Sequence, residues 1–322
     1  MDLKKIISPI DKELDVFQKQ FSKSMKSNVA LIDLITKYIL RQKGKKIRPA
    51  LVILSAKLCG TVNDRTYIGA NLVELLHTAT LIHDDVVDDA KTRRGLASIN
   101  AVWKNKASVL MGDFLLSKGL LVSLDNDEFR FLKITSDAVR RMSEGELLQI
   151  QKARNFDATE ETYFRVISDK TASLFKACCM IGALSVTDDE DIVQKMASYG
   201  ENLGIAFQIQ DDVLDYAGRK KLLGKSTGND LKEKKFTLPL IKALSNAPKK
   251  RSAEMMKLIK SDSLKKFKDV YDFVYEYKGI DYAIEKMEEY SVKAKNSIKD
   301  FKNSEVKASL MDLLNYLEIR NH

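Results

Sequence analysis

Proline is scarce in this chain of 322 residues, which contains only Pro9, Pro49, Pro239 and Pro248. Ordinary proteins contain about 5% proline. No proline ring interrupts a helix between Pro49 and Pro239, because none is present there. This long proline-free segment predicts an all-α protein.

Cysteine is rare as well, with three residues, two of them adjacent in the chain. An odd number that includes an adjacent pair does not suit a framework of disulfides. We therefore expect Cys59, Cys178 and Cys179 to be small buried hydrophobic residues of a protein kept in a reducing cytoplasm.

Long apolar runs are also missing. Runs such as Leu51–Leu54 are far shorter than the roughly 20 residues that span a bilayer. No apolar segment of signal length follows Lys4 and Lys5, so we expect a soluble, cytoplasmic protein without a signal peptide. Because internal repeats, low-complexity tracts and flexible linkers are absent, residues 1–322 are expected to form a single domain.

Acidic residues are fewer than basic ones, 45 against 54, and the net charge is +9. A basic balance favours anionic partners: nucleic acid, an acidic membrane surface or phosphorylated substrates. The lysines after Gly218 are interleaved with acidic residues and accompany no nucleic-acid-binding motif, which indicates solvated helix faces. Nucleic acid is thereby disfavoured, whereas a phosphorylated substrate and a peripheral membrane contact are retained.

Apolar residues recur at helical spacing along most of the chain. Helices are expected at residues 3–22, 29–41, 66–89, 98–124, 128–155, 159–185, 190–217 and 237–244, with three or four amphipathic helices after them. A basic loop at 43–49 is either a solvated turn or a phosphate clamp, and a second basic loop follows at 218–236. The acidic cluster Asp188–Asp191 is expected to open a helix, where acids complement the helix dipole.

The segment Leu76–Gly95 holds four aspartates followed by two arginines: Asp84, Asp85, Asp88, Asp89, Arg93 and Arg94. On a helix Asp84 and Asp88 lie one turn apart on one face, where like charges destabilise by roughly 0.3 kcal/mol. A bound cation would relieve this repulsion. Carboxylates without nearby thiolates favour a hard ion such as Mg²⁺.

A second acidic cluster, Phe207–Asp215, repeats the spacing. Asp211, Asp212 and Asp215 again read D-D-x-x-D on a predicted helix before a basic loop, and Gln208 lies on the same stripe of that helix. Two such clusters facing each other across a cavity can hold a diphosphate through several Mg²⁺ ions. Basic loop residues would then contact the phosphate oxygens and stabilise a departing pyrophosphate.

From about Gly44 to Pro239 the chain resembles the trans-isoprenyl diphosphate synthases of the polyprenyl synthetase family. LIHDDVVD with RRG after it resembles the first aspartate-rich motif of that family, FQIQDDVLD resembles the second, and the order of the motifs matches. The resemblance implies the isoprenoid synthase fold, an all-α arrangement of antiparallel helices around a deep central cavity, usually in a homodimer. It also implies condensation of an allylic diphosphate, farnesyl or geranyl diphosphate, with successive isopentenyl diphosphates to an all-trans polyprenyl diphosphate.

The resemblance also implies roles for individual residues. The catalytic set is Asp84, Asp85, Asp88, Asp211, Asp212, Asp215, Lys170, Thr171 and Gln208. Asp84, Asp88, Asp211 and Asp215 would bind Mg²⁺, about three ions per site, and Asp85 would support them. The isopentenyl diphosphate site would contain Lys45, Arg48, His77 and Arg94. The allylic diphosphate site would contain Arg93, Lys170, Thr171, Gln208, Lys225 and Lys235.

Three positions depart from the family pattern. Lys43 stands where the first basic motif usually has glycine, Lys46 where it has arginine, and Lys234 where a glycine usually precedes the last lysine. An arginine-to-lysine change loses the planar fork but keeps the charge. None of these changes removes a matched phosphate-binding residue, so activity is still expected.

Small residues before the first cluster bear on product length. In the family, aromatic residues just before the first motif block chain growth, whereas this chain has Ala79 and Thr80. We expect a tunnel that passes them towards Leu76 and Val73, and therefore a medium or long product such as the precursor of a quinone side chain. The alternatives are that Ala79 and Thr80 only pack helices, and that the product is a shorter farnesyl or geranylgeranyl diphosphate.

Other classes of protein share part of this pattern. A metal phosphohydrolase would use His77, His83 and Asp84 but gives the second cluster no role. A class I terpene cyclase shares the first cluster and the fold but usually lacks a second D-D-x-x-D. A non-catalytic partner subunit commonly loses one cluster. Because both clusters are intact, a synthase is favoured over these alternatives.

Overall fold

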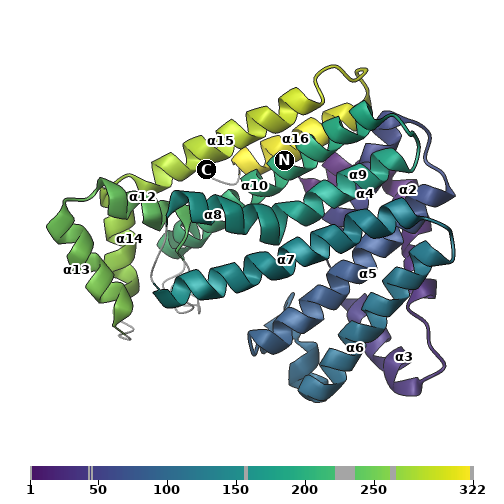
Figure 1. Ribbon diagram of the computed structural model, residues 1–322, viewed down its shortest axis with the longest axis horizontal. Coiled ribbons are helices and arrows are strands. Elements are labelled where there is room, and N and C mark those ends of the chain that lie inside the picture. The colour runs from purple at the N-terminus through teal and green to yellow at the C-terminus, as the bar shows by residue number, and fades with distance from the viewer. Residues whose placement is uncertain are drawn as a thin grey trace.

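The all-α prediction is confirmed by the computed structural model, which describes residues 2–42, 44, 46–155, 159–221, 236–261 and 266–319. Within these ranges long helices pack beside one another (Figure 1). Two short strands form the only sheet among the described residues. Lys45, Lys225 and Lys235, which the sequence places among the phosphate-binding residues, lie outside the described residues.

The expected helix over residues 3–22 is interrupted near Pro9. α1 (Leu3–Ile7) leads into the 3-10 turn η1 (Ser8–Ile10), and α2 (Asp11–Ser24) follows. Proline has no backbone N–H to donate, so it is tolerated at such a junction more readily than inside a helix. α3 (Ala30–Arg41) then agrees with its prediction to within one residue.

The next two helices lead to the first acidic cluster. α4 (Ile47–Cys59) contains Pro49 in its first turn, as expected. α5 (Asp64–Val87) starts two residues earlier than predicted because Asn63 caps it. The side-chain oxygen of Asn63 accepts a hydrogen bond from the backbone N–H of Thr66 at 3.2 Å.

α6 (Ile99–Leu124) and α7 (Phe129–Asn155) agree with their predictions. The single helix predicted over residues 159–185 is instead three elements. These are α8 (Glu160–Ile167), the π-helical turn η2 (Ser168–Ala172) and α9 (Ser173–Leu184). A π turn has the composition of an α-helix, so residue periodicity does not reveal it, although such turns are frequent at functional sites.

α10 (Glu190–Lys221) carries the second acidic cluster and opens where acids were expected to begin a helix. Asp189 Oδ1 accepts hydrogen bonds from the backbone N–H groups of Asp191 at 2.9 Å and Ile192 at 3.4 Å. The remaining described helices are α12 (Leu238–Asn246), α13 (Lys249–Lys260), α14 (Lys266–Glu276), α15 (Gly279–Ser297) and α16 (Glu305–Ile319).

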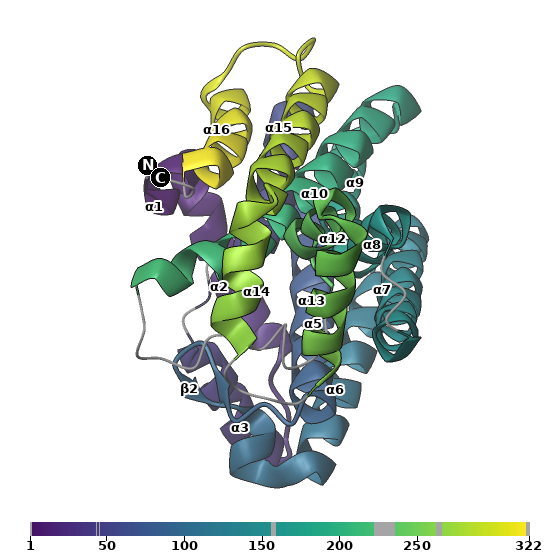
Figure 2. The ribbon, with the colours of Figure 1, turned by 90° about the vertical axis from the view of Figure 1, so that its left-hand side faces the viewer.

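The helices pack so that α4 and α9 lie inside the others. α5 packs along α6, and α10 packs along α9 and α15, while α4 contacts α5, α9 and α16. Seen from the end of the molecule, α1 lies beside α16, so the two ends of the chain meet (Figure 2). A smaller group of buried apolar residues lies among α12, α13 and α14.

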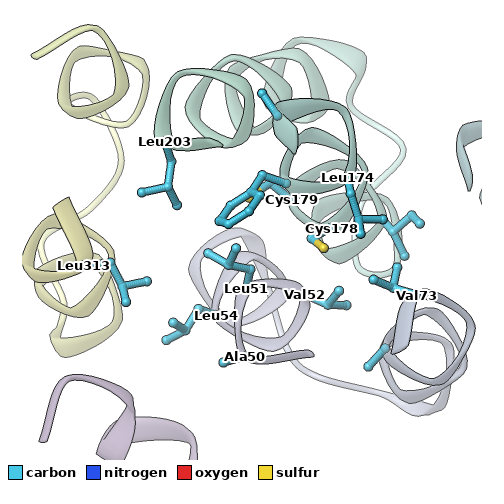
Figure 3. Close-up of a cluster of buried hydrophobic side chains, with 14 of the residues drawn as sticks. Ala50, Leu51, Val52, Leu54, Val73, Leu174, Cys178, Cys179, Leu203 and Leu313 are labelled. Carbon is cyan, nitrogen blue, oxygen red and sulfur yellow. The ribbon is translucent and has the colours of Figure 1, made fainter. Parts of the chain in front are cut away.

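The main core is centred on α4, whose residues from Pro49 to Ala56 are all buried. Leu51 and Val52 of α4 face the side chains of α9, where Cys178 and Cys179 lie (Figure 3). Both of these cysteines are buried, Cys59 is partly buried, and all three are free thiols. They therefore pack as hydrophobic residues, as the sequence indicated.

α6 departs from the expectation that no apolar segment is long enough to span a bilayer. It contains an 18-residue window of mean hydropathy 1.5, of which 33% is buried, and is the one helix among the described residues that meets this test of length and composition. The core helix of a soluble protein passes the same test. α6 packs along α5, and its outer face stays exposed.

Candidate active site

The first acidic cluster lies at the C-terminal end of α5. The backbone N–H of Asp88 donates to the carbonyl oxygen of Asp84 at 2.8 Å, so the two residues are one helical turn apart, as predicted. Both side chains are exposed. Asp89 follows with a φ of +46° and ends the helix, in the left-handed region that aspartate tolerates better than most residues.

Asp85 points away from this pair and is buried, with 2% of its surface exposed. Its Oδ1 accepts a hydrogen bond from Arg93 Nε at 2.7 Å and another from Arg93 Nη2. A buried carboxylate requires such partners, and charge-assisted bonds of this kind are the stronger ones. Asp85 therefore holds Arg93 beside the cluster.

A short hairpin follows the cluster, formed by β1 (Thr92–Arg93) and β2 (Leu96–Ala97). The residues of its turn, Arg94 and Gly95, have φ values of +51° and +79°, as a type I′ turn requires. The turn brings Arg94 onto the basic loop, where a Cβ on Gly44 would lie 2.4 Å from Arg94 Nη1. The missing side chain of Gly44 thus makes room for the guanidinium.

Arg48, His77 and Arg94 of the predicted isopentenyl diphosphate site lie near one another. The pKa of His77 is lowered well below its usual value, first by burial and then by the positive charges of Arg48 and Arg94. The imidazole is therefore neutral near pH 7. Burial raises the pKa of Glu74, three residues before His77, and the positive charges of Arg48 and Arg94 lower it again in part.

The π turn η2 carries Lys170 and Thr171. Lys170 Nζ forms an ion pair with Glu146 of α7 and donates to Gln149 Oε1 at 3.4 Å. Thr171 Oγ1 donates to Gln208 Oε1 on α10 at 2.8 Å. The turn is therefore joined to helices on both of its sides.

Two glycines allow the flanking helices to approach this turn. A Cβ on Gly145 of α7 would lie 2.9 Å from the backbone nitrogen of Lys170, and a Cβ on Gly204 of α10 would lie 2.6 Å from Ala172 Cα. Real Cβ atoms do not come so close to backbone atoms. η2 is consequently held between α7 and α10 at backbone contact distance.

The second acidic cluster, like the first, has one buried aspartate and two that are at least partly exposed. Asp212 is buried, with 6% of its surface exposed, and accepts hydrogen bonds from Gln208 Nε2 at 3.0 Å and Tyr163 Oη at 2.7 Å. Asp211 is exposed and Asp215 half-buried. Consecutive residues of a helix point about 100° apart, so the second aspartate of each doublet turns inward while the first faces solvent.

A cavity of about 160 Å³ lies between α7, α8, η2, α10 and α12. Lys170, Thr171, Gln208, Asp212 and Tyr163 all line it. A second cavity of about 70 Å³ lies between α2, α3, α5 and the hairpin, where Glu74, Arg93 and Arg94 contribute to its wall. Lys170, Thr171 and Gln208 of the predicted allylic site thus line the first cavity, whereas Arg94 of the predicted isopentenyl site lines the second, together with Arg93.

Charges from several helices meet at Asp84. Its pKa is raised, first because the surrounding protein removes part of its water and further because Glu146 is negative, while the positive charge of Lys170 opposes the shift. Lys170 and Glu146 are therefore electrostatic neighbours of the first cluster. Since Thr171 of the same turn bonds Gln208, η2 connects the two acidic clusters.

The donor groups present suit Mg²⁺ bound together with a diphosphate. Within the part of the chain that the structure describes, no three Asp, Glu, His or Cys side chains converge on one point. Mg²⁺ commonly takes only one or two carboxylates and completes its shell with water and substrate phosphates. The exposed carboxylates of Asp84 and Asp88, at i and i+4, provide such a pair.

The residues proposed to set product length lie on α5 above the cluster. Val73, Leu76 and Ala79 are buried, and Thr80 is half-buried. Leu76 faces α6, because a Cβ on Gly119 would lie 3.3 Å from Leu76 Cδ2. The two cavities described above are not lined by any of the four, so the open tunnel stays a prediction.

Sequence reasoning missed three residues of the site: Glu74, Glu146 and Tyr163. Glu74 precedes His77 by three residues and could have been found from that helical spacing. Glu146 and Tyr163 meet their partners across helices, Lys170 for Glu146 and Asp212 for Tyr163. No local sequence pattern predicts a contact between residues so far apart in the chain.

Comparisons with known proteins agree on the family. A sequence model of the family described as polyprenyl synthetase matches residues 29–275. The chain is 35% identical to the octaprenyl diphosphate synthase of Haemophilus influenzae over 100% of its own length and 98% of the relative. The crystal structure of a decaprenyl diphosphate synthase from Rhodobacter capsulatus is similar, with a TM-score of 0.94, 32% identity and 100% coverage of both chains. That of a polyprenyl synthase from Caulobacter crescentus, complexed with calcium and isoprenyl diphosphate, has a TM-score of 0.91 at 31% identity and covers 100% of this chain and 98% of its own.

Proposed function

The chain belongs to the polyprenyl synthetase family of prenyltransferases, and on that premise we propose that it joins an allylic diphosphate to successive isopentenyl diphosphates. The product is an all-trans polyprenyl diphosphate of medium or long chain, suited to a quinone side chain. The observation that carries the proposal is the linkage of two D-D-x-x-D clusters through η2. The positive charge of Lys170 in that turn opposes the rise in the pKa of Asp84, and the hydroxyl of Thr171 donates a hydrogen bond to Gln208.

Asp84 and Asp88 on α5, with Asp211 and Asp215 on α10, would hold the Mg²⁺ ions. The raised pKa of Asp84 supports this role, because it reflects partial desolvation and a like charge from Glu146 that a cation would relieve. When bound, the ions supply positive charge to the diphosphate that leaves. Asp85 and Asp212 serve differently, since each is buried and hydrogen-bonded to protein.

The isopentenyl diphosphate would bind where Arg48, Arg94 and neutral His77 lie together, and we propose that Lys45 also binds it. Arg48 Nε is buried and has no hydrogen-bond partner among the described residues. A buried donor in that condition is costly unless it meets an acceptor, which a phosphate oxygen provides. The carboxylate of Glu74 balances part of the positive charge of Arg48 and Arg94 when no diphosphate is bound.

The allylic diphosphate would bind between the aspartate clusters, with Arg93, Lys170, Lys225 and Lys235 on its phosphate oxygens. The allylic carbon–oxygen bond breaks, and the electron pair leaves with pyrophosphate. The double bond of isopentenyl diphosphate then attacks the allylic carbon, and pyrophosphate takes the proton that is lost. Backbone oxygens of Lys170 and Thr171, with Gln208, stabilise the cation. Apolar residues on part of the cavity wall, such as Val166, Ile167 and Ile241, help to keep water away.

The exposed apolar face of α6 supports a homodimer. Its exposed apolar residues are Val102, Val109, Leu110, Leu121 and Leu124, and Leu31 and Leu34 of neighbouring α3 are exposed as well. Several exposed apolar residues gathered on one helix of a soluble protein commonly mark an interface between chains. A second copy of the chain, meeting α6 with its own α6, would bury this face.

The compartment and the domain organisation belong to the same proposal. The free cysteines support a cytoplasmic enzyme. The main buried cluster draws residues from both ends of the chain, from Ile6 to Leu314, which supports one domain over residues 1–322. The positive net charge supports a peripheral contact with anionic lipid when the water-insoluble product is released.

The decisive experiment offers the purified protein farnesyl diphosphate with and without isopentenyl diphosphate, in Mg²⁺ and in EDTA. A synthase elongates only when both substrates and Mg²⁺ are present. Release of hydrocarbon from farnesyl diphosphate alone would indicate a cyclase, release of phosphate alone a phosphohydrolase, and no turnover a partner subunit. Asp84→Ala and Asp211→Ala should abolish condensation while the circular dichroism spectrum stays unchanged, and near-normal turnover in either would refute the assignment.

A further inference from the structure

Four side chains from three segments form one continuous chain of hydrogen bonds along the 160 Å³ cavity. Tyr163 Oη of α8 donates to Asp212 Oδ2 at 2.7 Å. Gln208 Nε2 donates to Asp212 Oδ1 at 3.0 Å, and Thr171 Oγ1 of η2 donates to Gln208 Oε1 at 2.8 Å. Of the four, Tyr163 is the one that the proposed mechanism leaves without a role.

The direction of every proton in this chain is fixed. Carboxylate oxygens only accept, so Gln208 must turn its amide nitrogen to Asp212 and its amide oxygen to Thr171. Thr171 has one hydroxyl proton and gives it to Gln208. Its Oγ1 is therefore left with lone pairs alone to offer to the cavity. An allylic group bound in this cavity, as proposed above, would face the negative end of the hydroxyl dipole.

We propose that Tyr163 is a positioning residue that acts through Asp212 and Gln208 to hold the Thr171 hydroxyl as an acceptor facing the allylic cation. This inference rests on the proposed function, because it concerns the same reaction. Without the Tyr163 hydroxyl, Asp212 Oδ2 loses a buried hydrogen-bond donor, and the carboxylate holds Gln208 less firmly. The amide of Gln208 then loses the constraint that selects its orientation, and the preorganised acceptor at Thr171 is lost.

The surroundings of Tyr163 suit this task. Its side chain is buried, with 6% exposed, and burial followed by the negative charge of Asp212 raises its pKa well above the usual value. The phenol therefore keeps its proton and remains a donor over the whole working range of pH. A chain of hydrogen bonds in such a low-dielectric place strengthens its members cooperatively.

The test measures kcat and KM for Y163F in wild-type, T171V and T171S backgrounds. Valine removes the hydroxyl of Thr171 at similar volume, whereas serine keeps it. Y163F should lower kcat about tenfold in the wild-type and T171S backgrounds and less than about twofold in the T171V background, because the hydroxyl it positions is already gone there. KM for isopentenyl diphosphate should not change, since Arg48, His77 and Arg94 are untouched.

Y199F is the matched control. Tyr199 is also buried, and its hydroxyl donates to the carbonyl oxygen of Leu310 at 2.8 Å, away from the cavity. Y199F should lower the unfolding temperature and leave kcat unchanged. If Y163F does not fold, D212N is measured in the same three backgrounds with the same expected pattern.

The outcomes separate this inference from the function itself. If Y163F slows T171V and wild type by the same factor, Tyr163 acts independently of Thr171 and the inference is wrong. Unchanged kcat in Y163F alone also overturns it. Failure of the wild-type protein to elongate farnesyl diphosphate would instead overturn the proposed function, because every variant is compared with the wild-type rate.

Discussion

Arg93 Nε lies 2.7 Å from Asp85 Oδ1, and this ion pair joins the hairpin to the buried side of the first acidic cluster. The exposed fractions of the two side chains are 32% for Arg93 and 3% for Asp85. Water therefore cannot readily replace the hydrogen bonds that Arg93 donates to the Asp85 carboxylate. We therefore expect the pair to set the direction from which Arg93 reaches a diphosphate. On this proposal Asp85 serves the allylic site through Arg93 and not as a direct metal ligand.

Asp85→Asn is expected to raise KM for the allylic diphosphate about tenfold, since an amide keeps the volume but loses the charge-assisted bonds that orient Arg93. Steady-state kinetics with varied allylic substrate measure the effect. Asp89→Asn is the control, because Asp89 belongs to the same acidic segment but pairs with Lys91 at an exposed position. Equal effects of the two variants would contradict a specific role for the Asp85–Arg93 pair.

Apolar spacing in the sequence predicted most of the helices, and the structure places both acidic clusters on helices as expected. Helix ends came within a few residues because apolar spacing follows the buried faces, and the acids before α10 cap it as expected. The π turn η2 and the Tyr163–Asp212 bond were not predictable in this way. Both depend on close contacts between helices far apart in sequence, such as those at Gly145 and Gly204. A single sequence does not reveal which helices pack against each other.

His77 provides a prediction of pH dependence. Its folded-state pKa lies well below the usual value, first because of burial and then because of Arg48 and Arg94. In the unfolded chain its pKa is about 6.5. As the pH falls below that value the unfolded state binds more protons than the folded state, so the free energy of unfolding decreases. Above that range the contribution of His77 is constant.

His77→Gln removes this titration while keeping a neutral side chain that can donate to a phosphate. Its unfolding temperature should therefore fall less than that of the wild type between about pH 7.5 and about pH 5.5. Differential scanning calorimetry at a series of pH values measures the difference. His83→Gln is the control, because His83 is only part-buried and lies at the contact of α5 with Val109 of α6. Parallel curves for wild type and His77→Gln would show that the pKa of His77 is the same in the folded and unfolded states.

Gly145→Ala tests whether close packing fixes the π turn. The new Cβ would lie 2.9 Å from the backbone nitrogen of Lys170 and 3.0 Å from Asp169 Cβ, so η2 must shift. A shift of this size in catalytic backbone atoms should lower kcat by about tenfold or more, while the far-ultraviolet circular dichroism stays helical. Gly119→Ala is the control, since its Cβ would meet only the ends of Leu76 and Leu72. Full activity in Gly145→Ala would mean that the turn tolerates displacement.

Leu110→Glu tests the pairing surface on α6. Leu110 is 59% exposed, and a charge there cannot be buried against a second copy without a large desolvation penalty. Analytical ultracentrifugation at micromolar concentration should find a dimer for the wild type and a monomer for the variant. Val292→Glu on α15, where Val292 is 53% exposed, should remain dimeric. A wild-type monomer at these concentrations would rule out the homodimer, and loss of the dimer in Val292→Glu would place the interface elsewhere.

Product length is tested at Ala79, a small residue of α5 that is 1% exposed. If the space beside it is a tunnel that the growing prenyl chain enters, Ala79→Phe should fit at small loss of stability and shorten the products. If the space is filled by protein, the added ring overpacks the core and destabilises the fold by about 1–3 kcal/mol without changing the ladder of products.

Thin-layer chromatography of radiolabelled products and thermal unfolding, measured on the same preparations, distinguish these cases. Thr78→Phe is the control at the same level of α5, because Thr78 lines the smaller cavity beside Glu74 and Arg94 instead. It is expected to alter the rate and to leave the length of the longest product unchanged. Shorter products from Ala79→Phe but not from Thr78→Phe would assign the chain-length wall to the face of α5 that carries Ala79. An unchanged ladder from Ala79→Phe would assign Ala79 to helix packing and leave the limit on chain length to other walls of the cavity.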